Sequence, residues 1–541
     1  MLLALPLAFL GAFLLYPLQG IIRESLLGET ASLDDLRPLW EDSYYLERLW
    51  FTTWQAALST LLTVGLALPC AWVLAHHEFP GKALVLAVVT IPFVLPTVVV
   101  AVAFSALVGP RGLANAVLME LPGVDEPPIR LFNTIWIILL AHVFYNLALA
   151  ARIIAAAWAN LDPRLGEVAA VLGYGRLERF ARVTAPLLKA PILAAGSLVF
   201  LFSFTSFGVI LILGGPRYAT IETEIYREMV FIFRPSLAAA LALIQMGVTF
   251  AFLAFYARLS KGRGVAAGVA ASPARPGRAG RLVAASIVVA LVLFTVAPLL
   301  ALVERSLHGA AGYTLEFYRS LGENTRNQAL FVTPFQAARN SVMFAASATA
   351  LAVPLGMLTA YGIQRVKRGA ALVEALLLMP LGVSAITLGL GFLVTLDEPP
   401  LELRASRWLI VIAHTLVAYP FVARAISGQL RAIDPRLREA ARTMGESSVG
   451  VFFRVDLPLL WRAIVVGAVF AFAISMGEFG ATLLIARPEW PTLPLAIFRY
   501  LGQPGALNYG QALAMSTILM SVTAAGFLVI DRMRIRGLGT F

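Results

Sequence analysis

The stretch Asp162–Pro186, DPRLGEVAAVLGYGRLERFARVTAP, decides how the chain is organised, because it occurs twice. The second copy, Asp434–Pro458, reads DPRLREAARTMGESSVGVFFRVDLP and begins 272 residues further on, with no gap between the two alignments. We call these stretches the first and the second module. Both are more polar than the long apolar segments around them. A polar module that recurs at fixed spacing between hydrophobic segments predicts a docking surface.

The composition places the chain among membrane proteins. It has 541 residues, of which 59% are hydrophobic and 13% are charged, whereas about 25% charged residues are typical of a soluble domain. The formal net charge is +11. Lys and Arg lie between the apolar segments and form no separate basic domain, so we interpret them as orientation signals and expect no nucleic-acid partner.

Cysteine usage limits the possible chemistry. Cys70 is the single cysteine and lies in an apolar run, which excludes a disulfide within one chain and a cysteine-rich metal site. We expect no metal and no cofactor. The N-terminal segment 1–22 is apolar and has neither a basic start nor a clear cleavage site, so it predicts a retained membrane span instead of a signal peptide.

Apolar runs of roughly 20 residues, long enough to cross a bilayer as helices, predict an all-α polytopic membrane protein with about twelve spans. The first six runs lie near residues 1–22, 51–75, 83–108, 134–157, 191–213 and 235–257. The second six lie near 282–304, 336–363, 371–395, 407–425, 463–486 and 508–531. The prolines Pro92 and Pro96 in the run at 83–108, and Pro380 in the run at 371–395, are positioned to break or kink these helices.

The spans divide into two halves, 1–258 and 282–541, joined by a linker at 259–281. The linker is rich in Gly, Ala, Pro and Arg and is expected to be a flexible tether. Basic residues cluster in the linker, in both modules and in the C-terminal tail. The positive-inside rule therefore predicts that these segments and both termini face the cytoplasm. Two parallel repeats imply a pseudo-two-fold axis along the membrane normal and a pathway between the halves.

Each module predicts a short capped helix. Asp162 and Asp434 each precede a proline, which suits an N-cap followed by Pro at the first helical position. Apolar residues follow at helical spacing, and Gly173 and Gly445 stand where a glycine would end the helix. A short helix with one apolar face needs a partner surface. Two related helices on one side of the membrane indicate a partner with two equivalent grooves.

The modules resemble the EAA loop of ABC importer permeases. In each copy a glutamate is followed by a glycine six residues later and a proline thirteen residues after that, although Val168 replaces an alanine of the motif. The resemblance implies two type-I permease repeats whose loops, at 160–190 and 432–462, dock on two ATP-binding subunits. The implied ATPase-coupling residues are Asp162, Glu167, Ala169, Ala170, Gly173, Pro186, Asp434, Glu439, Ala440, Ala441, Gly445 and Pro458.

The wider chain is similar to the thiamine permeases among these importers, in WEDSYYLERLWFTTWQAALSTLL, AHVFYNLALAARII and GGPRYATIETEIYREM. The resemblance implies import of thiamine or its phosphate esters from the external side to the cytoplasm, with an external substrate-binding protein. Fused permeases for ferric iron share the architecture and remain an alternative. The chain has no G-x-x-x-x-G-K-[ST] motif, so we expect ATP hydrolysis on a partner chain and no enzymatic activity here.

Three residues are candidates for the substrate pathway: Glu478, Tyr145 and Tyr419. Glu478 lies in an apolar span, where an ionisable side chain is costly and usually faces a cavity. A structural ion pair is the other interpretation of this residue. The two tyrosines are near His142 and His414, for which we expect interhelical hydrogen bonds. An ion-coupled secondary transporter is the weaker alternative, because Glu478 is the one strong candidate for an intramembrane acidic relay.

Overall fold

The computed structural model describes residues 2–27, 36–162, 164–260, 278–309, 312–323, 331–366, 368–397, 399 and 401–533. Most of the predicted linker, the proline of the first module (Pro163) and the end of the C-terminal tail lie outside these residues. The described part is built almost entirely of helices, and eleven of them are long and apolar enough to cross a membrane. The predicted all-α polytopic fold is therefore confirmed.

The first half contains the elements α1 (Ala4–Leu10), η1 (Gly11–Leu15), α2 (Tyr16–Leu27), α4 (Pro38–Glu41), α5 (Ser43–His76), α6 (Lys82–Val94), α7 (Thr97–Val108), α8 (Leu113–Met119), α9 (Ile135–Ala159), α10 (Arg164–Val171), α11 (Arg176–Arg179), η2 (Phe180–Thr184), α12 (Ala185–Phe204), α13 (Gly208–Leu213), η3 (Pro216–Tyr218), α14 (Ile221–Arg227), η4 (Glu228–Ile232) and α15 (Pro235–Ser260).

The second half contains α16 (Arg278–Leu307), β1 (His308–Gly309), β2 (Gly312–Tyr313), α17 (Glu316–Arg319), η5 (Ser320–Gly322), α18 (Pro334–Arg365), α19 (Ala370–Leu377), η6 (Met379–Gly382), α20 (Ala385–Thr395), α21 (Trp408–Ala432), α22 (Pro435–Thr443), α23 (Ser448–Val451), η7 (Phe452–Asp456), α24 (Leu457–Gly477), α25 (Gly480–Ile485), α26 (Leu493–Leu501) and α27 (Ala506–Met533). The two strands form an antiparallel pair in which His308 is opposite Tyr313.

Four predicted spans are interrupted. The run at 83–108 divides into α6 and α7 at Leu95 and Pro96, as its prolines suggested. The run at 371–395 divides at Pro380, also as predicted, into α19, η6 and α20, none of which is long enough to cross a membrane alone. Here Ser384 starts the second piece, because its hydroxyl accepts a hydrogen bond from Thr387 N at 3.1 Å and so caps α20. The runs at 191–213 and 463–486 were predicted as unbroken spans, but they are interrupted between α12 and α13 and between α24 and α25.

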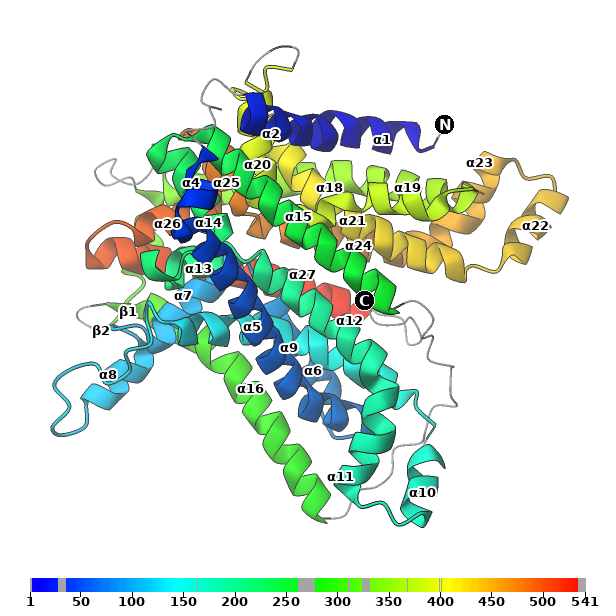
Figure 1. The fold of residues 1–541 in the computed structure, drawn as a ribbon, viewed down its shortest axis with the longest axis horizontal. Helices are drawn as coiled ribbons and strands as arrows, with labels where there is room; N and C mark the ends of the chain where they lie inside the picture. Colours follow the sequence, from blue (N-terminus) through cyan, green and yellow to red (C-terminus); the bar gives the residue numbers. More distant parts are fainter. Residues whose placement is uncertain are drawn as a thin grey trace.

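The two halves exchange their first helices. The segment α1–α2 packs against α18 and α20 of the second half, whereas α16 packs against α5, α6 and α7 of the first half (Figure 1). Gly391 of α20 permits the close approach of α2, since a Cβ at this position would lie 3.0 Å from Cβ of Pro17. The halves therefore share a hydrophobic core, to which buried side chains of both contribute.

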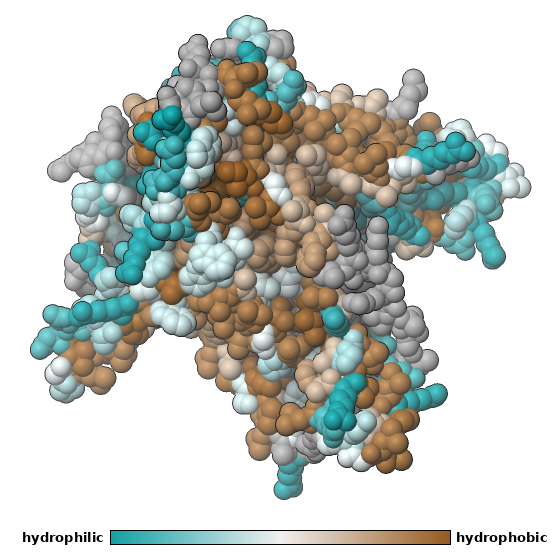
Figure 2. Space-filling model, viewed as in Figure 1, coloured by the Kyte–Doolittle hydropathy of each residue, from teal (hydrophilic) through white to brown (hydrophobic). Residues whose placement is uncertain are grey.

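The polar ends of the molecule lie on opposite sides. In Figure 1 the second module, α22–α23, lies at the far right and the first, α10–α11, at the bottom right on a separate arm, while α4, α8 and the β1–β2 hairpin lie to the left. Figure 2 shows that hydrophobic side chains cover most of the helical body between them, and that hydrophilic side chains gather on the projecting tip that carries α22 and α23. Both modules thus extend from the same end of an apolar body.

Candidate functional site

The two modules fold in the same way, as a short helix, a turn, a second short helix and a π-helical turn that leads into a long span. The elements are α10, α11, η2 and α12 in the first half and α22, α23, η7 and α24 in the second. Each begins with the predicted aspartate cap. The Asp162 Oδ1 atom accepts a hydrogen bond from Arg164 N at 2.9 Å, and Asp434 Oδ1 accepts one from Arg436 N at 2.9 Å.

Glycine ends both short helices, as the sequence predicted. Gly173 has a φ of 87° and Gly445 a φ of 89°, in the left-handed region that favours glycine. The residue after each glycine closes the turn. Tyr174 N donates to Ala169 O at 3.0 Å, and Glu446 N donates to the O atom of Ala441 at 3.1 Å. The chain therefore reverses at the same point in both modules.

The modules present side chains that have no covering surface in this chain. Of the twelve predicted coupling residues, Ala169 and Ala441 are buried and the other ten are exposed. Large apolar side chains are exposed as well: Leu165, Val168, Val171, Leu172 and Leu177 in the first module, and Leu437, Met444, Val449 and Phe453 in the second. Apolar side chains grouped on a projecting tip mark an interaction surface.

The second module is braced more strongly than the first. Arg438 Nε lies 2.7 Å from Oδ1 of Asp456, and the aspartate is buried. This ion pair fastens α22 to the turn that leads into α24. The equivalent positions in the first module, Gly166 and Thr184, carry no charge. The described part of the first module therefore has no equivalent ion pair at these positions.

The broken helices meet between the two halves. The rings of Phe207 and Phe479 lie 5.6 Å apart with 28° between their planes, and each ring follows the break in its own half, between α12 and α13 or between α24 and α25. Gly477 lies against the α6–α7 break, because a Cβ at Gly477 would come within 2.9 Å of Pro96. Gly480 is as close to Ala385 at the start of α20.

A cavity of about 290 Å³ lies beside the Phe207–Phe479 pair. It is lined by the end of α6, the start of α7, α9 and the end of α12, and by α21 and α24 of the second half. Tyr145, a predicted pathway residue, is part of the lining. The lining residues on α24, Phe470 to Gly477, all precede Phe479 in a helix that runs from the second module. The cavity is therefore on the module side of the aromatic pair.

The other two predicted pathway residues are hydrogen-bonded within the second half. Oε1 of Glu478 accepts from Ala481 N at 2.8 Å and Oε2 accepts from Thr482 N at 3.0 Å, so the carboxylate caps α25. His414 Nε2 lies 3.3 Å from Oε2 of Glu478. The Tyr419 hydroxyl donates to the carbonyl of Leu377. A role for these side chains on the pathway stays a prediction.

The two histidines form the interhelical contacts that the sequence analysis expected. His414 Nδ1 on α21 lies 2.7 Å from Ser475 Oγ on α24, and His142 Nδ1 on α9 lies 2.9 Å from Ser59 Oγ on α5. In the second half, His414 therefore contacts the carboxylate of Glu478, whereas the first half has the serine Ser206 at the position equivalent to Glu478.

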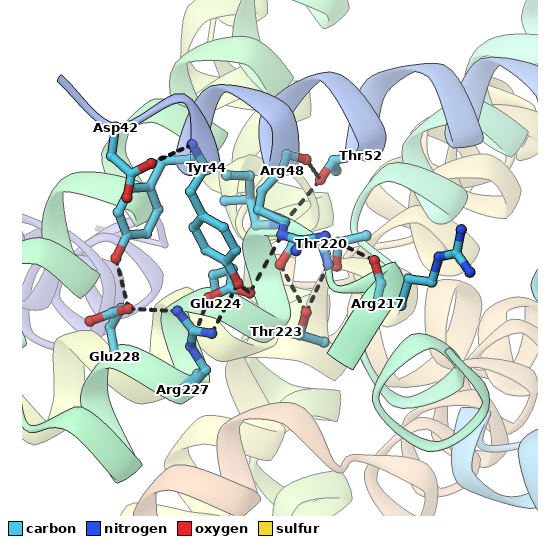
Figure 3. A network of polar contacts seen from close by, with 12 residues as sticks. Asp42, Tyr44, Arg48, Thr52, Arg217, Thr220, Thr223, Glu224, Arg227 and Glu228 are labelled. Carbon is cyan, nitrogen blue, oxygen red and sulfur yellow. Dashed lines mark hydrogen bonds and ion pairs between the residues drawn. The ribbon is translucent and has the colours of Figure 1, made fainter. Parts of the chain in front are cut away.

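A buried polar cluster, which the sequence analysis did not assign, joins α5 to α14 (Figure 3). The Tyr44 hydroxyl donates to Glu224 Oε1 at 2.7 Å, and the Tyr45 hydroxyl donates to Glu228 Oε1 at 2.8 Å. Arg227 lies between the two glutamates, with its Nε atom 2.9 Å from Glu224 Oε2. Three glutamates within residues 222–228, between two apolar runs, were the sequence signal for this cluster.

The helix α14, which carries part of the polar cluster, also contacts the Phe207–Phe479 pair. The ring of Tyr226, on α14, contacts the ring of Phe207 at a centroid distance of 5.8 Å. On the same helix, Glu222 is buried and accepts a hydrogen bond from Gln245 Nε2 at 2.6 Å. Burial raises the pKa of Glu222 to about 8, because the charged form loses its hydration. Because Tyr226 packs on Phe207, movement of α14 would change the packing around the Phe207 ring.

These features define a class: a membrane protein of two tandem helical repeats, with one projecting polar module per repeat and a cavity between the repeats. Within the described ranges, no group of three His, Cys, Asp or Glu residues could hold a metal ion. The family of binding-protein-dependent transport system inner membrane components matches the chain twice, over residues 64–265 and 352–534. The chain belongs to this family, and it is an ABC importer permease with both halves in one polypeptide.

Curated relatives match nearly the whole length. The chain is 27% identical to the thiamine transport system permease protein ThiP of Escherichia coli (strain K12) over 524 residues, which cover 94% of this chain and 93% of that protein. It is 27% identical to ThiP of Brucella abortus (strain 2308) over 496 residues, with 91% and 88% covered. It is also 25% identical to the probable ABC transporter permease protein y4fN of Sinorhizobium fredii, over 96% of this chain and 94% of that one.

Proposed function

We propose that this permease carries thiamine or its phosphate esters from an external binding protein into the cytoplasm. The observation that supports this proposal is the end-to-end similarity to thiamine permeases, at 27% identity over 94% of the chain for one of them. In this proposal Tyr145 lines the substrate path, while Glu478 and Tyr419 hold the helices that border it.

We further propose that the two modules receive the energy of ATP hydrolysis from two copies of an ATPase subunit on the cytoplasmic side. Three features support this assignment: the modules fold alike, they extend from the same end of the molecule, and they expose apolar side chains there. The capped helices are rigid enough to act as levers, because the helix start and the glycine turn are both fixed by hydrogen bonds. Movement of a module would pass directly into α12 or α24.

The proposed function is tested by uptake into proteoliposomes that contain the permease, its ATPase and its binding protein. We expect uptake of radiolabelled thiamine that requires ATP and competition by thiamine phosphate. ATP-dependent uptake of labelled ferric iron in place of thiamine would favour the alternative substrate. Uptake driven by an ion gradient without the ATPase would overturn the importer proposal altogether.

A further inference from the structure

We propose that the cavity beside the Phe207–Phe479 pair is a binding site for an aromatic organic cation in transit through the membrane. Its volume of about 290 Å³ is near the lower end of the range for small-molecule sites. The inference rests on the proposed function, because thiamine is a cation with two planar heteroaromatic rings. It adds to that function a place in the membrane where the substrate is held.

Aromatic rings form much of the cavity lining, and they come from both halves of the chain. The rings belong to Phe93, Tyr145, Phe202, Phe421 and Phe470. Phe93 and Phe202 contact each other at a centroid distance of 5.9 Å. Such rings stack on a planar ligand, and their faces attract a positive charge without a carboxylate. Attraction by ring faces alone also allows the ligand to leave again, which a transport intermediate requires.

A buried polar side chain without a well-formed hydrogen bond also lies in this cavity. Ser206 is 3% exposed and lines the cavity next to the Tyr145 hydroxyl, but within the described ranges no hydrogen bond of normal geometry reaches its own hydroxyl. A buried hydroxyl without a partner is costly. An amino or hydroxyl group of a bound ligand would satisfy it. In the second half the equivalent residue is Glu478, whose carboxylate is hydrogen-bonded to α25 and lies beside His414. The polar contact for a ligand is therefore on the first-half side.

The lining separates the two substrate classes considered for this family. Among the described residues that form it, there is no carboxylate, imidazole or thiol. Protein iron sites use carboxylate, imidazole or thiolate ligands, none of which the lining provides. An aromatic cation finds rings from both halves and four side chains that carry a hydroxyl, Thr97, Tyr145, Thr205 and Ser206. The chemistry of the cavity thus fits an organic cation and does not fit a bare metal ion.

The experiment uses the full-length permease in detergent, with Ser206→Cys introduced into a Cys70→Ser background. The new thiol is then the only one in the chain. We expect a small cationic thiol reagent to label Cys at this position, and thiamine or benzyltrimethylammonium to slow the labelling. Phe202→Leu, which keeps an apolar side chain but removes a ring face, should raise the half-protecting concentration about fivefold. Phe294→Leu, in a different apolar cavity between α5, α9 and α16, should leave it unchanged.

Three outcomes separate this inference from the proposed function. Protection by thiamine that weakens in Phe202→Leu alone supports the site. Efficient labelling without protection by either cation, in a preparation whose unsubstituted permease imports thiamine, overturns the site and leaves the proposed function intact. Protection by benzyltrimethylammonium together with no thiamine import overturns the proposed function but supports the aromatic-cation site. If Ser206→Cys does not fold, equilibrium binding of radiolabelled thiamine to Tyr145→Phe and Phe202→Leu provides the same test, and unchanged binding by both overturns the site.

Discussion

Phe207 and Phe479 occupy equivalent positions in the two repeats, and their rings stack on each other at the centre of the molecule, 5.6 Å apart. Both side chains are buried. Each follows the break in a long helix that begins at a docking module, so movement of either module reaches one ring of the pair.

The stacked pair should be energetically coupled. Phe207→Ala and Phe479→Ala are each expected to cost about 3 kcal/mol of stability, as for other buried phenylalanines. The double variant should cost less than the sum by about 0.5–1.5 kcal/mol, because the ring contact is lost only once. Unfolding in mixed detergent micelles measures these values. Phe9 packs on Phe13 and Tyr419 instead, so Phe207→Ala combined with Phe9→Ala should be additive, and additivity in the Phe207–Phe479 cycle would contradict the coupling.

The glycine turns of the modules should be essential for coupling. Proline fixes φ near −65°, whereas Gly445 has a φ of 89°, so Gly445→Pro cannot form the turn after α22. We expect this variant and Glu439→Lys to remain in the membrane but to lose uptake while the ATPase still hydrolyses ATP. Gly166→Ala is the matched control, since Gly166 lies inside α10 with open space around it. Normal uptake by Gly445→Pro at equal expression would contradict the lever role.

The sequence was most informative where local interactions decide the structure. The caps at Asp162 and Asp434 and the turns at Gly173 and Gly445 depend on residues a few positions apart, so the pattern predicted them correctly. The helix breaks were harder. Prolines indicated the breaks after α6 and α19, but the breaks after α12 and α24 were missed because the apolar runs at 191–213 and 463–486 have the composition of unbroken spans.

The sequence could not predict side-chain partners and cavities that depend on packing between segments far apart in the chain. Glu478 stood out as a charge in an apolar span, yet its partners depend on how α21 packs against α24 and α25. The same holds for Tyr419, whose hydroxyl bonds to the carbonyl of Leu377 on a different helix. The cavity was not predictable either, because its lining comes from six helices distributed over both halves. Tyr145 lies in this lining, and its role on the substrate pathway stays a prediction.

The ion pair in the second module should make the two modules unequal. Asp456→Asn removes the charge that Arg438 contacts at 2.7 Å, and we expect a loss of about 1–3 kcal/mol, as for other buried hydrogen bonds to charged groups. Uptake should fall with it, because α22 is then less firmly attached to α24. Thr184→Ala, at the equivalent place in the first module, should change neither quantity measurably. Equal effects of the two substitutions would show that the Arg438–Asp456 ion pair does not stabilise the second module.

Stability should depend on pH through Glu222. Its folded pKa of about 8 lies above the value of about 4.3 in an unfolded chain, so the folded state keeps a proton that the unfolded state releases. The stabilising contribution is complete below about pH 4.3 and is lost as the pH rises through 8. Glu222→Gln keeps an acceptor for Gln245 and has no such proton, so its melting temperature relative to the unsubstituted protein should increase from pH 5 to 8. The exposed Glu47→Gln should show no such trend, and a parallel trend in both would contradict the assignment.

The role of Glu478 can be decided by measuring stability and transport on the same variants. Its two carboxylate oxygens accept hydrogen bonds from the first turn of α25, and one of them lies beside His414. If the side chain acts as a cap, Glu478→Gln should lower stability by about 1–3 kcal/mol, Glu478→Ala should lower it further, and the KM for uptake should stay within about twofold for any variant that folds. Thr482→Val removes one neighbour of the carboxylate and should have the smallest effect. A large increase in KM for Glu478→Gln with unchanged stability would instead place this carboxylate on the substrate path.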